Sequence, residues 1–392
     1  MDSEDEVLET RFRGFGREAA GTSPLYRSLC GSLADDVAEG GLFVTVMRAA
    51  PLRRRMPNLV FAAVQRVLFD EPGDPLAEYY PSLGGGRVPD AELFGAFTAF
   101  VVHHRERIEA LISTGETQTN EVLRSGQVFP ALGWAHACTR RPLGLIEVGT
   151  SAGLLLHADR YSYVYEFDDG SVRHAGLGDA DGVPDLHCAV STGEASDAAA
   201  ARAALEPFIA KDLRVASRVG LDVNPLDPAN PEDRAWLRAL VWPEHTERRT
   251  RLEAALDHAR RRPVRLRKGT GLRLLPDAVD SVPQTAIPCV FVSNSLPHWE
   301  PEDRGRFVAL VRELGARRDL VLVLKELYAG GLGLFTGRKD DPSAGSAPGE
   351  SPAVPRETLA AAVFLGGSER LFHLGTAGMH GAGLEWSPRP AG

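Results

Sequence analysis

A glycine-rich segment near the middle of the chain has the residue types and spacing of a ligand-binding turn. Residues 143–159 read LGLIEVGTSAGLLLHAD, an apolar run that contains one acid, Glu147, followed by Gly149 and Gly153. Glycine allows the backbone to turn sharply and to approach a ligand closely. The start of the following helix would present unpaired N–H groups and the positive end of its dipole. The segment therefore predicts a strand, a tight turn and a helix around a ligand.

Three interpretations of this turn are open at the level of the sequence. It can be a nucleotide-type cradle, as in doubly wound α/β folds. It also matches the G-x-S-x-G nucleophile elbow, which would make Ser151 a nucleophile. In the third interpretation the glycines serve only a tight turn between a strand and a helix. The cradle would place five residues at a cofactor: Glu147, Gly149, Thr150, Ser151 and Gly153.

The nucleophile elbow makes a demand that the sequence does not meet. An elbow serine needs core strands before it, whereas the residues that precede Ser151 are predicted to be helical. The order Ser…Asp…His could still be filled by Ser151, Asp319 and His380. Asp319, however, would begin a strand, and the acid of such a triad follows a strand end. A serine hydrolase that uses Ser151 is therefore the alternative function.

The spacing of Glu147, Gly149, Ser151 and Gly153 resembles the first strand and turn of class I S-adenosylmethionine (SAM) methyltransferases, with Ser151 in place of the middle glycine. More of the chain is similar to an uncharacterised bacterial family, the domain of unknown function numbered 2332. That resemblance covers most of the chain, from about the first helices to Trp386. It lies in the segments TQTNEVLRSG, EVGTSAGL, GLDVNPLD, VWPE and HG…LEW.

The methyltransferase resemblance implies SAM as the cofactor and gives roles to residues after later strands. Asp222, at the end of the second predicted core strand, would accept hydrogen bonds from both ribose hydroxyls. Asn294, after the fourth strand, would face the methyl donor, and His298 would be the catalytic base. Thr270 stands where such enzymes often carry an acid near the adenine, so the adenine contact stays open.

A polar segment, residues 117–126, directly precedes a predicted apolar helix. It can be a helix cap, in which Thr119 or Asn120 caps and Glu121 lies in the first turn. It can also form a polar wall over the cofactor site, because a cap needs one such residue rather than four. The second interpretation makes Glu121 catalytic and assigns four residues to substrate binding: Gln118, Thr119, Asn120 and Arg124.

Composition favours a soluble globular protein and disfavours a polyanionic substrate. The 392 residues are 43% hydrophobic and 25% charged, with a net charge of −9. Nucleic-acid binding usually needs a basic surface, so a nucleic-acid partner is not expected. No apolar run reaches the length of a membrane span, and the acidic start MDSEDEVLET is unlike a targeting peptide. We expect a cytoplasmic location and no membrane partner.

Neither the cysteines nor the histidines have the spacing of a metal site. The four cysteines lie far apart and form no C-x-x-C pair, which predicts reduced core residues. His373 and His380, with Glu385, fit no helical metal motif. No metal is therefore expected.

Apolar periodicity predicts two domains. Residues 1–140 would form an all-helical domain that acts as a lid. Residues 141–392 alternate strands and helices, which predicts an α/β, Rossmann-like, doubly wound, mostly parallel sheet, like that of the class I methyltransferases. Within it, residues 154–218 would be a β-hairpin insertion and residues 330–355 a flexible loop.

Together these features predict a SAM-binding protein that methylates a small molecule. Besides the serine hydrolase, a non-catalytic Rossmann-like binding protein is a further alternative, because Ser151 and Thr270 depart from the methyltransferase pattern.

Overall fold

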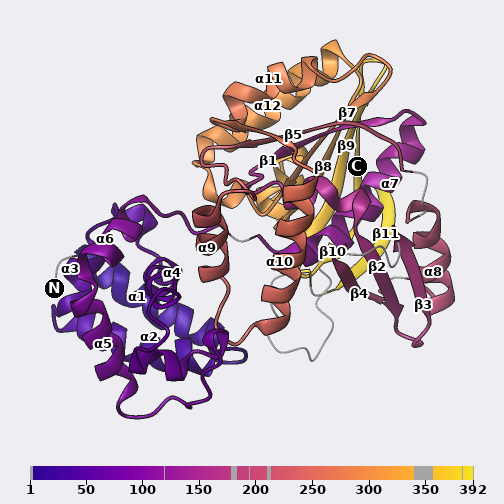
Figure 1. Cartoon of the computed structure of the whole chain (residues 1–392). Helices are drawn as coiled ribbons and strands as arrows, with labels where there is room; N and C mark the ends of the chain where they lie inside the picture. The colour runs from indigo at the N-terminus through magenta and orange to yellow at the C-terminus, as the bar shows by residue number, and fades with distance from the viewer. Residues whose placement is uncertain are drawn as a thin grey trace. The chain divides into compact units, whose positions relative to one another are not determined.

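The computed structural model divides the chain into two compact units (Figure 1). The first comprises Met1–Asn120 and Ala229–Glu253, and the second comprises Glu121–Pro228 and Ala254–Gly392. The predicted boundary at residue 140 is too late, because residues 121–140 pack on the sheet of the second unit. The structure describes residues 3–118, 120–177, 183–193, 195–209, 213–339, 356–381 and 383–391.

Helices make up the first unit, as predicted for the N-terminal region. Its α-helices are α1 (Ser3–Ala19), α2 (Pro24–Ala38), α3 (Leu42–Met47), α4 (Pro57–Leu68), α5 (Leu93–His103), α6 (Arg105–Thr114), α9 (Pro231–Ala239) and the first half of α10 (Thr246–Arg261). Three short 3₁₀ helices connect them: η1 (Leu52–Arg54), η2 (Pro75–Tyr79) and η3 (Pro81–Leu83). An aromatic core holds them together, with Tyr26 stacked on Phe61 at 4.2 Å between ring centroids.

Residues 229–253 belong to the first unit because their backbone and side chains are bound there. The buried Gln65 side chain donates through Nε2 to the carbonyl oxygens of Ala239 and Val241, both at 2.8 Å. Trp236 donates through Nε1 to the Glu116 carbonyl at 3.1 Å. A buried amide that lost these acceptors would stay unsatisfied, which is costly. The chain therefore leaves the second unit after β5 and returns to it within α10.

The second unit is built on one sheet whose eleven described strands follow the order β3-β2-β4-β11-β10-β9-β8-β7-β1-β5-β6. Six of its strand pairs are parallel and four are antiparallel. The strands are β1 (Leu143–Val148), β2 (Ser162–Phe167), β3 (Val172–Gly176), β4 (Asp185–Ser191), β5 (Val215–Asp222), β6 (Arg265–Lys268), β7 (Ile287–Ser293), β8 (Leu320–Glu326), β9 (Glu357–Leu365), β10 (Ser368–Ala377) and β11 (Leu384–Pro390). The prediction of an α/β protein with a helical N-terminal region and a large, mostly parallel sheet is confirmed.

Five parallel strands form one half of this sheet, in the order β6-β5-β1-β7-β8. Chain order runs outward in one direction from β1 through β5 to β6, and in the other direction from β7 to β8. The strand order therefore reverses beside β1. In open α/β sheets, ligands bind in the crevice outside the carboxyl ends of the strands at such a reversal.

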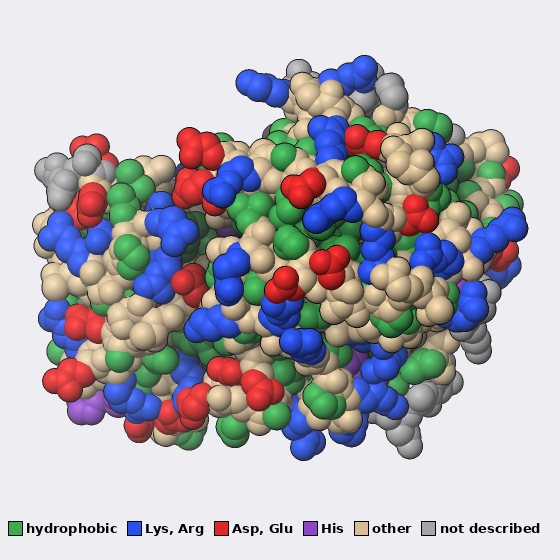
Figure 2. All heavy atoms as spheres, turned by 90° about the horizontal axis from the view of Figure 1, so that it is seen from above, with side chains coloured by type: hydrophobic (Ala, Val, Ile, Leu, Met, Phe, Trp, Pro, Cys, Tyr) green, Lys and Arg blue, Asp and Glu red, His purple; other side chains and the backbone are tan. Residues whose placement is uncertain are grey.

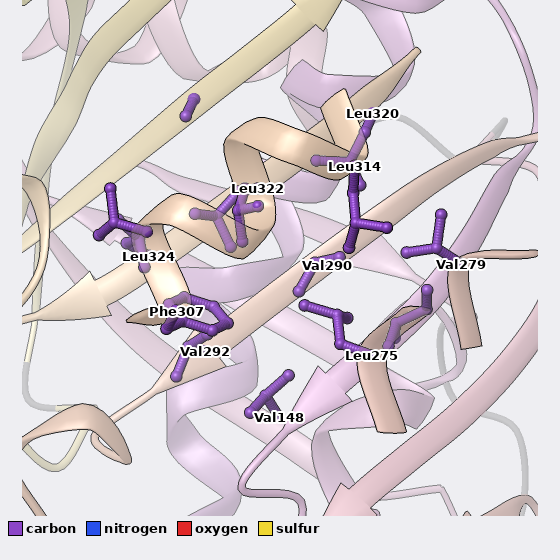
Figure 3. Close-up of a cluster of buried hydrophobic side chains, with 14 of the residues drawn as sticks. Val148, Leu275, Val279, Val290, Val292, Phe307, Leu314, Leu320, Leu322 and Leu324 are labelled. Atoms are coloured by element: carbon purple, nitrogen blue, oxygen red, sulfur yellow. The ribbon is translucent and has the colours of Figure 1, made fainter. Parts of the chain in front are cut away.

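Helices cover both faces of this half sheet. The unit's remaining helices are α7 (Ser125–Thr139), α8 (Ala198–Leu205), α11 (Gly271–Asp280), α12 (Pro301–Arg317), α13 (Leu332–Thr336) and the 3₁₀ helices η4 (Val122–Arg124), η5 (Leu154–Arg160), η6 (Glu206–Phe208), η7 (Leu296–His298) and η8 (Tyr328–Gly330). On one face, alternate strand side chains such as Val148, Val292 and Leu322 pack against Leu275 of α11 and Phe307 of α12 (Figure 3). Helix α7, which contacts β7, β8 and β9, contributes nothing to this cluster and lies on the other face.

The predicted insertion, residues 154–218, is more than a hairpin. Strands β2 and β3 form the expected antiparallel hairpin. However, β2 also pairs in parallel with β4, and β4 pairs with β11 near the end of the chain. The insertion thus extends the same sheet, because β11 supplies a free edge for it.

The predicted flexible loop, residues 330–355, begins with regular structure. Helices η8 and α13 occupy residues 328–336, where Leu332 and Phe335 pack into the core. This part of the prediction is wrong, because apolar residues anchor the segment despite its glycines. Residues 340–355 lie outside the described part of the chain.

Candidate functional site

All buried Asp, Glu, Lys and Arg side chains described in the second unit lie at the ends of strands or just before α7. We call this group the strand-end cluster: Glu121, Arg124, Glu147, Asp222, Lys325, Glu326 and Glu357. The acids and bases lie beside the point where the strand order reverses. Buried charges are rare unless they are paired or functional, so the cluster marks the candidate site.

The Gly149–Gly153 turn follows β1 and has an unusual backbone. Gly149, Ser151 and Gly153 have φ angles of 80°, 49° and 72°, in the left-handed region. The N–H groups of Gly149 and Thr150 donate to the Leu221 carbonyl of β5, at 2.8 and 3.3 Å. These bonds hold the turn against the end of the neighbouring strand. The segment after it, η5, is a seven-residue 3₁₀ helix rather than the expected α-helix, so it offers no helix-dipole site.

Gly149 lies against the end of β7. A Cβ atom added at Gly149 would come within 2.1 Å of Ser295 Oγ. A side chain at this position would therefore clash as well as strain the backbone. The contact brings the turn after β1 and the residues after β7 together.

Asp222 points toward the Gly149–Gly153 turn. Its carboxylate accepts a hydrogen bond from the Ser151 N–H at 2.8 Å through Oδ2, and another from the Asn224 N–H at 2.8 Å through Oδ1. The side chain is 9% exposed. A carboxylate offers about four lone-pair positions, so these two bonds leave room for further donors. The sequence placed this acid correctly at a strand end, and the structure adds its bonds to the turn.

Glu147 lies beneath the turn and accepts the Thr150 hydroxyl at 2.6 Å. Burial raises the pKa of Glu147 to about 8, and the charge of Asp222 adds to this, while Thr150 and Arg124 act in the opposite direction. The side chain is only 3% exposed. Glu147 therefore supports the turn through Thr150.

The residues after β7 meet the end of β8. Glu326 accepts hydrogen bonds from the N–H groups of Ser295 and Leu296 through Oε1, at 2.8 and 3.2 Å. Burial raises the pKa of Glu326 to about 7. Asn294 has a left-handed φ of 54°, and its Nδ2 donates to the Met379 carbonyl at 3.4 Å. Asn294 directly follows β7, and its expected place at the methyl donor stays a prediction.

Three donors converge on the Met379 carbonyl oxygen. They are Asn294 Nδ2, Arg124 Nε at 3.3 Å and Lys325 Nζ at 3.3 Å. Lys325 also forms a fully buried ion pair with Glu357, the first residue of β9. Burial lowers the pKa of Lys325 to about 8. These contacts hold the segment after β10 against the ends of β7 and β8.

Glu121 lies at the start of η4 and His298 lies in η7, and their expected catalytic roles stay predictions. Glu121 is itself the N-cap of η4 and accepts the Leu123 N–H at 3.1 Å, whereas the cap interpretation gave that position to Thr119 or Asn120. His298 is exposed, and desolvation followed by the charges of Arg124 and Arg304 lowers its pKa. His298 lies near Arg124 and therefore at the rim of the cluster.

The other residues of the predicted polar wall belong to the first unit. Gln118 and Asn120 line a cavity of about 20 Å³ with Leu237 and Arg248, which has room for roughly one water molecule. Thr119 lies outside the described residues. Substrate binding by these residues stays a prediction.

The hydrolase triad is not assembled. Ser151 follows the carboxyl end of β1, whereas Asp319 precedes β8 at the opposite edge of the sheet. In the strand register, Leu145 of β1 lies beside Cys289 of β7, and Cys289 lies beside Val321 of β8. Asp319 is two residues before Val321 and Ser151 is six residues after Leu145, so the length of a strand separates the two side chains. At about 3.3 Å per residue this distance excludes a direct relay. Asp319 instead accepts the Gly366 N–H at 2.9 Å.

Two features are absent from the described part of the chain: a metal-binding cluster and a membrane-spanning helix. No group of three or more His, Cys, Asp or Glu side chains there could hold a metal ion. No helix among these residues is both long and apolar enough to cross a bilayer. On the face in Figure 2, acidic and basic side chains are interspersed.

Sequence reasoning missed Lys325, Glu326 and Glu357. The signal was present in DLVLVLKEL, where two charged residues close an otherwise apolar strand. Charged residues at the end of a buried parallel strand lie at the carboxyl edge of the sheet, and ligands bind at that edge in open α/β sheets. Glu357 could not be found in this way, because its pairing with Lys325 depends on the antiparallel return of β9.

Comparison with known proteins gives a family without a described activity. The sequence profile of one family, "Uncharacterized protein conserved in bacteria (DUF2332)", matches residues 9–386. No curated protein and no solved structure matches the chain. The match covers nearly the whole sequence, so the chain belongs to this family, DUF2332.

Proposed function

We propose that this protein binds SAM at the Gly149–Gly153 turn and transfers its methyl group to a small molecule. The observation that carries the proposal is the Asp222 carboxylate, which lies at the end of β5 and points toward the turn. The strand order supports it, because β6-β5-β1-β7-β8 corresponds to the order 3-2-1-4-5 of doubly wound nucleotide-binding sheets. The finer fold assignment, a methyltransferase-like Rossmann domain, is part of this proposal.

The residues present fit the cofactor at three points. Gly149 and Gly153 give the turn a backbone that a ligand can approach closely. Asp222 keeps lone pairs for the two ribose hydroxyls. Asn294 has a buried Oδ1 that accepts no hydrogen bond from the described residues. Thr270, which caps α11, gives no acid for the adenine amino group, so backbone groups would have to serve there.

When bound, SAM supplies a methyl group on a positively charged sulfur. The task of the protein is then to orient the acceptor and to exclude water. Acids that surround this position favour a cationic cofactor electrostatically. The strand-end cluster has that character, because four acidic side chains face two basic ones even when Glu147, with its pKa of about 8, is protonated.

The test is the affinity for SAM of an Asp222→Asn variant, measured by calorimetry. A hydrogen bond to a charged group contributes about 1.5–3 kcal/mol, and each 1.4 kcal/mol is about tenfold in affinity. We therefore expect a ten- to hundredfold loss, with little change in folding. Asp168→Asn is the matched control, because Asp168 also accepts a backbone N–H, that of Thr192, in a loop after β2. Equal affinities in wild type and Asp222→Asn would refute the assigned role.

A further inference from the structure

We propose that the strand-end cluster binds the methyl acceptor as a small amine, and that Glu326 receives the proton the amine releases. The proposal rests on the proposed function and names its substrate class. Three independent observations support it: the charge of the cluster, its unpartnered acceptor atoms, and its connection to the Gly149–Gly153 turn.

The charge of the cluster favours a cation. Its acids are Glu121, Glu147, Asp222, Glu326 and Glu357, and its bases are Arg124 and Lys325. Glu147, with a pKa of about 8, is mostly protonated at neutral pH, so the other four acids supply the negative charge. Lys325 is already paired with Glu357. Buried like charges repel one another strongly, so an added positive charge is stabilised there and an added anion is not. A carboxylate or phosphate acceptor is therefore disfavoured.

Three buried side-chain oxygen atoms at the ends of β7 and β8 have no hydrogen-bond partner among the described residues: Ser293 Oγ, Asn294 Oδ1 and Glu326 Oε2. Glu326 Oε2 and Asn294 Oδ1 accept no hydrogen bond from the described residues, although Glu326 is fully buried. Glu326 Oε1 is satisfied by the Ser295 and Leu296 N–H groups, so the unpartnered oxygen is Oε2. Buried polar atoms are usually paired, and a ligand explains such exceptions. An ammonium group offers three donors to these acceptors, whereas a hydroxyl offers one.

Glu326 is connected to the turn through one residue. Ser295 donates its N–H to Glu326, and its side chain lies against Gly149. An amine at Glu326 would therefore lie next to a cofactor held by the turn. The acceptor atoms are buried in this structure, so the side chains around them have to move for an amine to enter.

The proposed reaction is a proton transfer to Glu326 followed by methyl transfer to the amine nitrogen. The ammonium first gives one proton to Glu326 Oε2, which leaves a neutral amine with a free lone pair and a neutral carboxyl group. The nitrogen lone pair forms the new N–C bond to the methyl group, while the C–S bond breaks and its electron pair stays on sulfur. Asn294 Oδ1 positions the nitrogen by accepting a remaining N–H. A carboxyl group with a pKa near 7 can both receive and return a proton at neutral pH.

The experiment measures binding, so that it does not depend on turnover. The protein is first saturated with S-adenosylhomocysteine, and its affinity for that compound is recorded. It is then titrated by calorimetry with methylamine, ethanolamine and benzylamine, and with methanol, ethylene glycol and benzyl alcohol. We expect at least one amine to bind, the alcohols to bind at least tenfold more weakly, and Glu326→Gln to weaken the amine at least tenfold. Glu302→Gln, an exposed carboxylate of α12, is the control and should behave like wild type.

The outcomes separate this inference from the proposed function. Failure to bind S-adenosylhomocysteine would refute the proposed function itself. Normal cofactor binding without amine binding would overturn the amine inference alone, as would equal amine affinity in Glu326→Gln and wild type. Should Glu326→Gln fail to fold, Asn294→Gly takes its place, because glycine accepts the left-handed φ of 54°. That variant should also bind the amine more weakly, and unchanged binding would overturn the inference.

Discussion

Asp222 and Glu147 stand at the ends of neighbouring strands and have different surroundings. The Asp222 carboxylate accepts hydrogen bonds from two backbone N–H groups and keeps lone pairs toward the turn. Glu147 is buried beneath the turn, with the Thr150 hydroxyl as its donor. The first is therefore suited to a ligand and the second to support. Environment rather than residue type separates the two roles.

The raised pKa of Glu147 predicts a pH-dependent stability. Its folded pKa of about 8 lies above the unfolded value of 4.5, so the unfolded chain loses this proton first. The contribution of Glu147 is fully present below pH 4.5 and is lost as the pH rises to about 8. Glutamine does not titrate, so the Glu147→Gln variant does not lose this contribution to the free energy of unfolding as the pH rises. The free energy of unfolding of the variant, relative to wild type, should therefore be higher at pH 8 than at pH 5 in urea titrations, and a pH-independent difference would contradict the assignment.

Gly149 predicts a measurable steric effect. Gly149→Ala places a Cβ atom 2.1 Å from Ser295 Oγ at a φ of 80°. Gly170→Ala has a similar φ of 76° but open space around it, so it isolates the backbone strain of about 1–2 kcal/mol. Denaturant titrations should show a larger loss of unfolding free energy for Gly149→Ala than for Gly170→Ala, together with weaker SAM binding. Equal losses would mean that the contact with Ser295 does not matter.

The residues of the turn could be found from the sequence because they are adjacent and their types are specific. Gly149, Ser151 and Asp222 were identified by spacing and by their place at strand ends. The convergence on the Met379 carbonyl could not be found, because it joins residues 124, 294, 325 and 379. Contacts that depend on tertiary pairing leave no local pattern.

Strands β8 and β9 share the buried Lys325–Glu357 pair at their common edge. Removing one partner leaves an uncompensated buried charge, which costs about 3–5 kcal/mol, whereas replacing both with apolar residues is often neutral. We expect Lys325→Met to lower the free energy of unfolding by that amount, and Lys325→Met with Glu357→Leu to recover most of it. Lys339→Met, at an exposed site, should have no effect. A double variant as unstable as Lys325→Met would contradict the pairing.

The strands that could be predicted from the sequence are those with a distinctive residue pattern. The core strands β7 and β8 are apolar almost throughout, which is typical of buried parallel strands, and were recognised from that pattern. The hairpin of β2 and β3 was recognised from the alternating tyrosines and the Asp-Asp-Gly turn. Its membership in the main sheet was not recognised, because it depends on the pairing of β4 with β11, nearly two hundred residues later.

At the scale of the molecule, the order of the units along the chain is interrupted. The first unit takes up residues 229–253 after β5, so its core depends on a segment from the middle of the sequence. Apolar periodicity predicted α9 as a helix but could not assign it to a unit, because the bonds of Gln65 to Ala239 and Val241 are long-range. Whether a segment forms a helix depends on its local sequence, whereas the unit to which it belongs depends on long-range contacts.

SAM is proposed to bind between the turn after β1 and Asp222, the last residue of β5. A crystal structure of the protein saturated with S-adenosylhomocysteine tests it most directly. We expect the ribose hydroxyls within hydrogen-bonding distance of the Asp222 carboxylate, with the backbone of Gly149–Gly153 against the ligand. Density for the ligand at any other place, or none at a concentration a hundred times the measured Kd, would contradict it.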